Sequence, residues 1–110
     1  MKEQQIVQAL SGLAHPVRLK VFRALVVAGA KGLTPGVMQE GLGIPATTLS
    51  FHLKEMSSAG LVTVERSSRH QIYRAAFEQF SEVLRYLTEN CCEGGSCAIE
   101  PSVAKLEFQG

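Results

Sequence analysis

Apolar residues recur at helical spacing through most of the chain. Residues 3–13 predict an amphipathic helix, because their larger apolar side chains are three or four positions apart. A second helix is expected from Pro16, since proline suits the first turn of a helix, and the glycine-containing residues 29–32 end it. This second helix is apolar around much of its surface, which is typical of an element at the centre of a core.

Two further helical segments follow closely. The first begins at Thr34 and Pro35, a capping residue and a proline at the first helical position, and it ends at the glycines of residues 41–43. The second covers residues 44–58 and is terminated by the Ala-Gly pair of residues 59–60. Its inward apolar positions are Leu49, Leu53 and Met56. Two helices joined by so tight a glycine turn predict a helix-turn-helix.

The pattern then changes to that of a β-hairpin. Residues 61–66 and 71–75 have the β-branched, extended character of strands, and the polar residues 67–70 form a turn between them. A last amphipathic helix is predicted over residues 77–90. The hairpin follows the helix-turn-helix directly, so it is expected to form a wing.

We therefore expect a mainly α fold of the α+β class, a winged helix-turn-helix in residues 1–92. The remaining residues, 93–110, have too few apolar side chains for a further domain, and their end, residues 105–110, is also consistent with an added non-native segment. Of the 110 residues 45% are hydrophobic and 19% charged, which excludes a disordered or collagen-like chain. A monomer this short buries only about two-thirds of its unfolded surface, so a homodimer would enlarge its core.

The sequence also predicts where the protein acts. The longest apolar stretch, residues 21–28, is interrupted by Arg23 and is far shorter than the ~20 residues of a membrane span. The polar residues 1–5 precede no long apolar run, so no secretory signal peptide is expected. These features predict a cytoplasmic protein without membrane contact, in which clustered cysteines indicate metal binding or catalysis. The net charge is only +1, so DNA binding would require a local excess of positive charge.

Several stretches of the chain carry a family resemblance. Residues 13–22, LAHPVRLKVF, resemble the Leu-x-x-Pro-x-Arg motif that opens the ArsR/SmtB family of winged-helix repressors. Residues 42–44 and 47–53, and then 59–62, resemble the recognition helix of that family and its exit into the wing. The match extends over about residues 5–90. This resemblance implies a homodimeric repressor that binds double-stranded operator DNA and is not an enzyme.

The predicted recognition helix presents polar and aromatic side chains opposite its apolar face. Hydroxyl groups can bond to bases or phosphates, and an apolar side chain can meet a thymine methyl group. Basic residues of the helix and wing supply the local positive charge. The candidate DNA contacts are Thr47, Thr48, Ser50, Phe51, His52, Lys54, Arg66, Arg69 and Arg74.

Some of these candidates have competing interpretations. His52 is expected mainly to anchor the helix or a phosphate, with base contact as the lesser alternative. Family relatives often carry arginine or another polar residue at the position of Phe51, so the bases that are read stay open. For the wing arginines the alternative is a solvated hairpin. For the domain as a whole, it is a winged helix used only for protein contacts.

The resemblance also implies that the first and last helices form a dimer interface. Their candidate interface residues are Ile6, Leu10, Phe80, Val83, Leu84 and Leu87. The alternative for both apolar faces is intramolecular core, and in a chain of this length we expect some of each. In a dimer the two recognition helices would lie about 34 Å apart, on successive major grooves of a roughly palindromic operator.

All three cysteines lie close together near the end of the last predicted helix. Cys91, Cys92 and Cys97 fall within seven residues. Thiolates are soft ligands, and three of them suit trivalent arsenic or antimony, whereas structural zinc usually takes four ligands. Neighbouring side chains on a helix do not face each other, so binding is expected to fray or bend the helix end. We therefore predict As(III), or Sb(III), as inducer at these three residues, with no organic cofactor.

The resemblance narrows to one branch of the family. The better-known arsenic site, a Cys-x-Cys motif on the short helix, is absent because residues 34–39 contain no cysteine. The chain instead resembles a branch in which a vicinal pair and a third cysteine bind arsenite at the end of the last helix. The Asp and His ligands of zinc sensors are missing, since residues 77–90 contain neither. The resemblance implies control of an arsenic-resistance operon.

Other roles for the cysteines are also open. They could form a cadmium, lead or zinc site, act as a thiol redox switch, or be inert. The competing class is an enzyme, a small thiol oxidoreductase or arsenate reductase. Such enzymes need an activated thiolate. Here the thiols follow a helix C-terminus and lie near Glu89 and Glu93, which disfavours the thiolate form.

Overall fold

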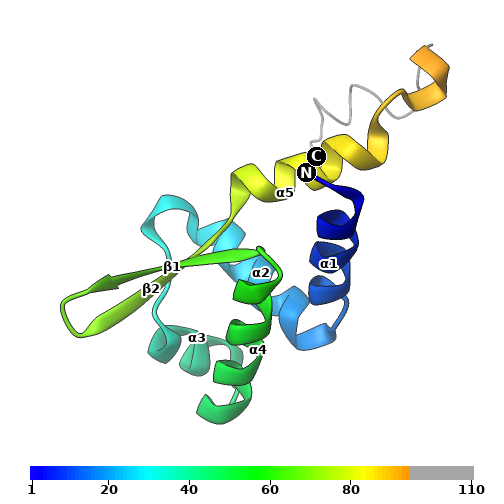
Figure 1. Cartoon of the computed structure of the whole chain (residues 1–110). Coiled ribbons are helices and arrows are strands. Elements are labelled where there is room, and N and C mark those ends of the chain that lie inside the picture. Colours follow the sequence, from blue (N-terminus) through cyan, green and yellow to red (C-terminus); the bar gives the residue numbers. More distant parts are fainter. Residues whose placement is uncertain (95–110) are drawn as a thin grey trace.

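The computed structural model describes residues 1–94, and the last predicted ligand, Cys97, lies outside them (Figure 1). Its elements follow the predicted order of helix, helix, short helix, helix, hairpin and helix, which confirms the mainly α winged helix-turn-helix. The elements are α1 (Glu3–Leu13), α2 (Pro16–Ala28), the 3-10 turn η1 (Gly29–Lys31), α3 (Pro35–Leu42), α4 (Ala46–Ser58), β1 (Val62–Ser67), β2 (His70–Ala75), α5 (Phe77–Thr88) and the 3-10 turn η2 (Cys91–Gly94).

Capping residues set the helix ends, and of these the sequence predicted Thr34 but not His15. His15 caps α2, because its Nδ1 atom accepts a hydrogen bond from the backbone N–H of Val17 over 3.1 Å. Thr34 caps α3 in the same way, with its hydroxyl oxygen 3.4 Å from the backbone nitrogen of Val37. Gly43 ends α3 in the left-handed conformation, at φ 67°, which glycine adopts without steric cost. The turn between α3 and α4 is therefore encoded locally.

The hairpin is longer than the sequence pattern predicts. The pairing of β1 with β2 is antiparallel and extends to Ser67 and His70, so the turn consists of Ser68 and Arg69 alone. Leu33 adds a bridge beside the hairpin by exchanging two backbone hydrogen bonds with Tyr73, over 2.9 and 2.8 Å. The wing is thus anchored at its base to the segment between α2 and α3, and it projects from the body (Figure 1).

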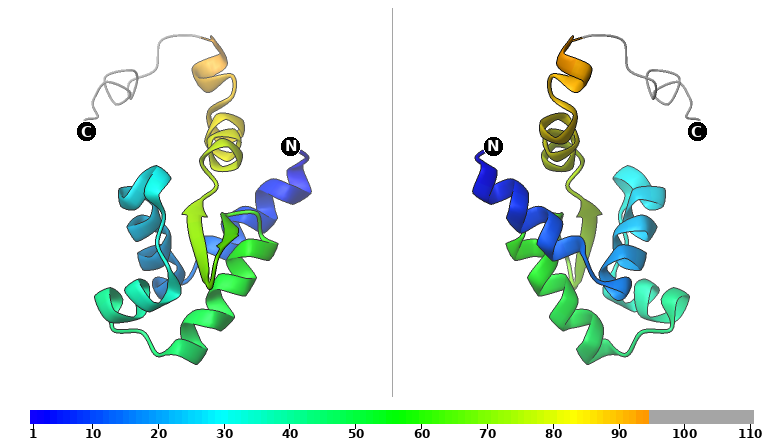
Figure 2. Two further views of the ribbon diagram at one scale, coloured as in Figure 1. Left: turned by 90° about the vertical axis from the view of Figure 1, so that its left-hand side faces the viewer. Right: turned by 90° about the vertical axis from the view of Figure 1, so that its right-hand side faces the viewer.

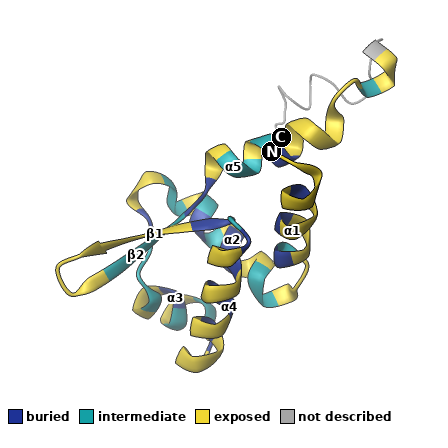
Figure 3. Ribbon diagram, viewed as in Figure 1, coloured by how far each residue is buried: buried dark blue, intermediate teal, exposed yellow. Residues whose placement is uncertain are grey.

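The core lies where α1, α2, α4, the wing base and α5 meet (Figure 3). As predicted, α2 is central, and its residues Val21, Phe22 and Leu25 are buried. Figure 2 shows α5 at the end of the molecule opposite the α3–α4 turn. No helix within residues 1–94 has the length and apolar character needed to cross a membrane.

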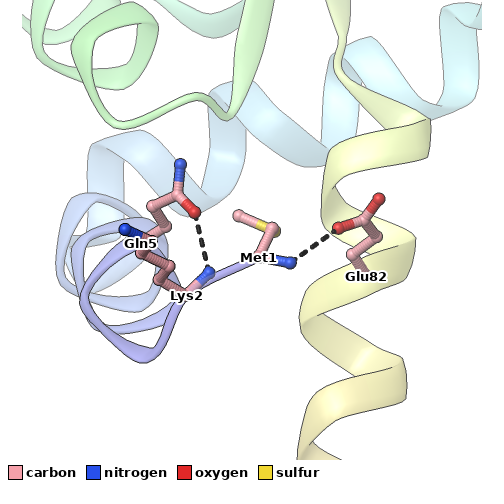
Figure 4. Close-up of polar contacts among 4 residues, drawn as sticks. All are labelled: Met1, Lys2, Gln5 and Glu82. Carbon is pink, nitrogen blue, oxygen red and sulfur yellow. Dashed lines mark hydrogen bonds and ion pairs between the residues drawn. The ribbon is translucent and has the colours of Figure 1, made fainter.

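The start of α1 is held beside α5 (Figure 4). The amino group of Met1 lies 3.4 Å from a carboxylate oxygen of Glu82, and the Gln5 side chain accepts a hydrogen bond from the backbone N–H of Lys2 over 2.8 Å. These contacts are exposed and contribute little by themselves. They nevertheless place the two helices predicted to dimerise on the same side of the domain.

Candidate nucleic-acid interface and thiol site

The outer face of α4 is the candidate DNA-reading surface. Its apolar residues Leu49, Leu53 and Met56 are buried against the core, as their spacing predicted. Five of the six candidate contacts on this helix are exposed on its other sides, namely Thr47, Thr48, Ser50, Phe51 and Lys54. They occupy the N-terminal two-thirds of the helix, and a recognition helix reads bases mainly through residues near its N-terminus.

His52 does not share this exposed face. Only 6% of its surface is exposed, and its Nδ1 atom accepts a hydrogen bond from Nε of Arg18 over 3.0 Å. The His15 ring lies beside it, with the two ring centroids 4.5 Å apart. This position fits the predicted anchoring role, because the imidazole joins α4 to α2 from behind the reading surface.

Burial also sets the charge of His52. Desolvation lowers its pKa below the usual histidine value, the electrostatic interactions with His15 and Arg18 lower it further, and Glu55 partly opposes them. A neutral imidazole keeps Nδ1 available as an acceptor for Arg18. Sequence reasoning missed Arg18 as a partner of this helix, although the Leu-x-x-Pro-x-Arg motif contains it.

The wing arginines divide into two groups. Arg66 and Arg69 are exposed, and none of the ion pairs within residues 1–94 involves them. Arg74 is half-buried, donates from Nη1 to Glu65 over 2.7 Å, and donates from Nε to the carbonyl of Ala30 over 2.7 Å. Arg74 therefore braces the wing base, while the other two place positive charge along the hairpin.

The candidate interface residues also divide. Ile6 and Val83 are fully buried in the core of the single chain, and Phe80 is half-buried with its ring 5.0 Å from that of Phe22. The remaining candidates are exposed: Leu10, Leu84 and Leu87. Val7, which sequence reasoning did not single out, is exposed on α1 as well. Both α1 and α5 thus keep exposed apolar side chains in the monomer.

The last helix ends before the cysteines. The sequence predicted helix to residue 90, but α5 stops at Thr88, and Asn90 adopts a left-handed conformation, which asparagine tolerates better than most residues. Cys91 and Cys92 lie in η2, where a positive φ of 54° at Cys92 turns the two sulfur atoms to within 3.5 Å of each other. The helix thus ends two residues earlier than predicted, and the two thiols already lie close together, so the expected fraying of the helix end on binding is not needed to bring them together.

The two described thiols do not form a complete site by themselves. Within residues 1–94, no three His, Cys, Asp or Glu side chains are grouped closely enough to hold a metal ion. Cys91 is half-buried and Cys92 is exposed. A three-thiolate site would need Cys97, which belongs to the part of the chain that is not described.

Comparison with known proteins agrees with this arrangement. A helix-turn-helix domain family model matches residues 13–65. The HTH-type transcriptional regulator YgaV of Escherichia coli (strain K12) is 25% identical over 89 residues, which are 81% of this chain and 88% of that protein. The ArsR-like transcriptional regulator from Rhodococcus sp. RHA1 has a TM-score of 0.72 at 19% identity, over 82% of each chain. A homodimeric winged helix-turn-helix DNA-binding domain from Mycobacterium bovis has a TM-score of 0.62 at 24% identity, over 86% of this chain and 87% of that one.

The fold and the exposed outer face of α4 are those of a winged helix-turn-helix domain, and the chain is similar to proteins named as transcriptional regulators. The solved structures share the winged helix-turn-helix fold that the motifs of the sequence predicted. The relatives are DNA-binding regulators and not enzymes, which agrees with the predicted class.

Proposed function

We propose that the protein is a cytoplasmic homodimeric repressor that leaves its operator when As(III) or Sb(III) binds to Cys91, Cys92 and Cys97. The operon it controls would confer arsenic resistance. The observation that carries the proposal is the convergence of the Cys91 and Cys92 sulfur atoms directly after α5.

The separation of the two sulfurs suits a shared soft ion. Two thiolates that bind one zinc ion at about 2.3 Å in tetrahedral geometry lie about 3.8 Å apart, and the observed distance is 3.5 Å. A disulfide between the same two residues is disfavoured, because their Cα atoms are about 3.8 Å apart and disulfides usually need at least about 4.4 Å. This geometry favours ligand binding over a redox switch at the vicinal pair.

The position of the thiols suggests how binding is transmitted. Leu84 and Leu87 are exposed on the helix that leads into η2, so a change at Cys91 acts on the last turns of α5. If these turns form the dimer interface, ligation alters the relative orientation of the two recognition helices. The ion must then bind the DNA-free arrangement more tightly, and such couplings are typically about 1–3 kcal/mol.

The test is a fluorescence anisotropy titration of the full chain on a palindromic duplex, in reducing buffer, with and without As(III). We expect As(III) and Sb(III) to weaken binding at least about fivefold, the lower end of typical couplings, and Zn(II) and Cd(II) to have less effect. Replacing Cys91, Cys92 or Cys97 by serine should abolish the response without changing DNA affinity. A response that persists in all three variants, or a stronger response to Cd(II) or Zn(II), would contradict the proposed inducer.

A further inference from the structure

Phe51 lies in the middle of the outer face of α4. Thr47 precedes it by four residues and Lys54 follows it by three, so these side chains form one stripe opposite the buried face. Phe51 is 56% exposed, although it is the largest apolar side chain of the helix. It lies within the N-terminal half of α4, the part from which recognition helices reach base edges.

The exposed ring of Phe51 is contacted by two side chains of the same domain, Arg18 and His52. The guanidinium carbon of Arg18 lies 5.9 Å from the ring centroid, within the range of a cation–π contact, and the His52 ring meets it edge-on with centroids 5.2 Å apart. Arg18 is itself fixed by the bond to His52 and by a second bond from Nη1 to the carbonyl of Gly12, over 3.3 Å. The ring therefore presents a defined apolar surface and not a freely rotating one.

We propose that Phe51 reads the methyl group of one thymine in each half-site of the operator. The ring has no hydrogen-bonding atom, and thymine alone offers an apolar group in the major groove. A G·C pair at the same position would bury polar base edges against the ring without partners, which is unfavourable. Arg18 and His52 act as positioning residues, because both contact the ring while His52 is itself buried and Arg18 belongs to α2. This inference rests on DNA binding by α4 and does not depend on the inducer.

The experiment removes the methyl group alone. The full chain selects its site from a random DNA pool, and each thymine of the selected duplex is then replaced by uracil, which lacks the 5-methyl group. We expect a weakening of about fourfold at one thymine per half-site, the equivalent of about 0.8 kcal/mol for one buried methyl-sized group. Phe51→Ala should bind the thymine and uracil duplexes equally, and Phe51→Leu should keep part of the preference.

Two further variants distinguish an effect on thymine recognition from a general effect on the fold. Arg18→Gln leaves the ring in place and loosens its support, so the thymine-to-uracil ratio should fall towards one even where overall affinity is changed. Val27→Ala removes an exposed apolar side chain of α2 and should keep the full ratio. The proposal is overturned if no thymine replacement weakens wild-type binding, or if Phe51→Ala keeps the wild-type ratio. Adding As(III) to the same titrations tests the inducer independently, since an unresponsive complex still yields the ratio.

Discussion

Arg18 donates a hydrogen bond from Nε to Nδ1 of His52 over 3.0 Å and so joins α2 to the recognition helix. His52 is the one buried polar side chain of the described core. An unsatisfied buried polar group costs about 1–3 kcal/mol, more than a satisfied bond contributes. The orientation of α4 is therefore tied to the protonation state of one imidazole.

Stability should fall as the pH drops below about 6.5, the ordinary pKa of histidine. Burial lowers the pKa of His52 in the folded chain, and the electrostatic interactions with His15 and Arg18 add to the effect. The unfolded chain then takes up its proton at a higher pH than the folded chain does. The contribution to the unfolding free energy is complete above about 6.5 and is lost as the pH falls through the folded-state pKa. Urea denaturation at several pH values measures this.

The matched variants for this pH experiment are His52→Gln and His70→Gln, since His70 is exposed on the wing. The first should reduce the loss of stability below about pH 6.5, and the second should leave this loss unchanged. Parallel loss of stability in wild type and His52→Gln would show that other groups cause it.

Gly12→Ala should destabilise the fold by about 1–3 kcal/mol. A Cβ atom at Gly12 would lie 2.6 Å from the Cβ of Ala59, so α1 and the end of α4 would have to separate. Neither atom belongs to a flexible side chain that could move aside. Gly41→Ala is the control, because nothing lies within 4 Å of its Cβ position in α3, and it should stabilise by about 0.5–1 kcal/mol. Thermal and urea unfolding of both variants decide the prediction; an unchanged Gly12→Ala midpoint would contradict the close contact.

Leu87→Glu should weaken the dimer at least about tenfold, since it replaces about 1.5–3 kcal/mol of apolar burial by a desolvated charge. In the monomer Leu87 is 55% exposed, so the fold itself should tolerate the change. Val27→Glu, at a position 76% exposed on α2, is the matched control and should leave the dimer intact. Sedimentation equilibrium measures the dimer dissociation constant of each variant. Equal constants for the two variants would show that Leu87 on α5 is not part of the dimer interface.

Arg69→Ala should reduce the salt dependence of DNA binding more than Arg74→Ala does. Arg69 is exposed in the wing turn, whereas Arg74 is engaged with Glu65 and the carbonyl of Ala30. Each phosphate contact contributes about 0.9 to the slope of log affinity against log salt, so a dimer that loses two arginines loses about 1.8. Titrations at several salt concentrations measure the slopes. Identical slopes for Arg69→Ala and wild type would mean that the wing tip does not reach the backbone.

The local features of the fold were predictable from sequence because they depend on neighbouring residues. Thr34 caps the helix that follows it, as predicted, and the spacing of the apolar residues of α4 placed its inner face correctly. The end of α5 was predicted two residues too late, because nothing in the apolar pattern stops at Thr88. The helix ends there because the backbone turns at Asn90, which has a positive φ, and the pattern of apolar side chains does not specify backbone dihedral angles.

The sequence by itself determined the order of elements and the winged helix-turn-helix class, and it predicted surfaces for DNA and for a second subunit that stay predictions. Only the tertiary structure decided which candidates serve the fold and which stay exposed. Ile6 and Val83 became core while Leu84 and Leu87 did not, although all four are apolar at helical spacing. The physical reason is that periodicity describes each helix alone. Contacts between distant segments, such as the bond between Arg18 and His52, depend on how the helices pack against one another.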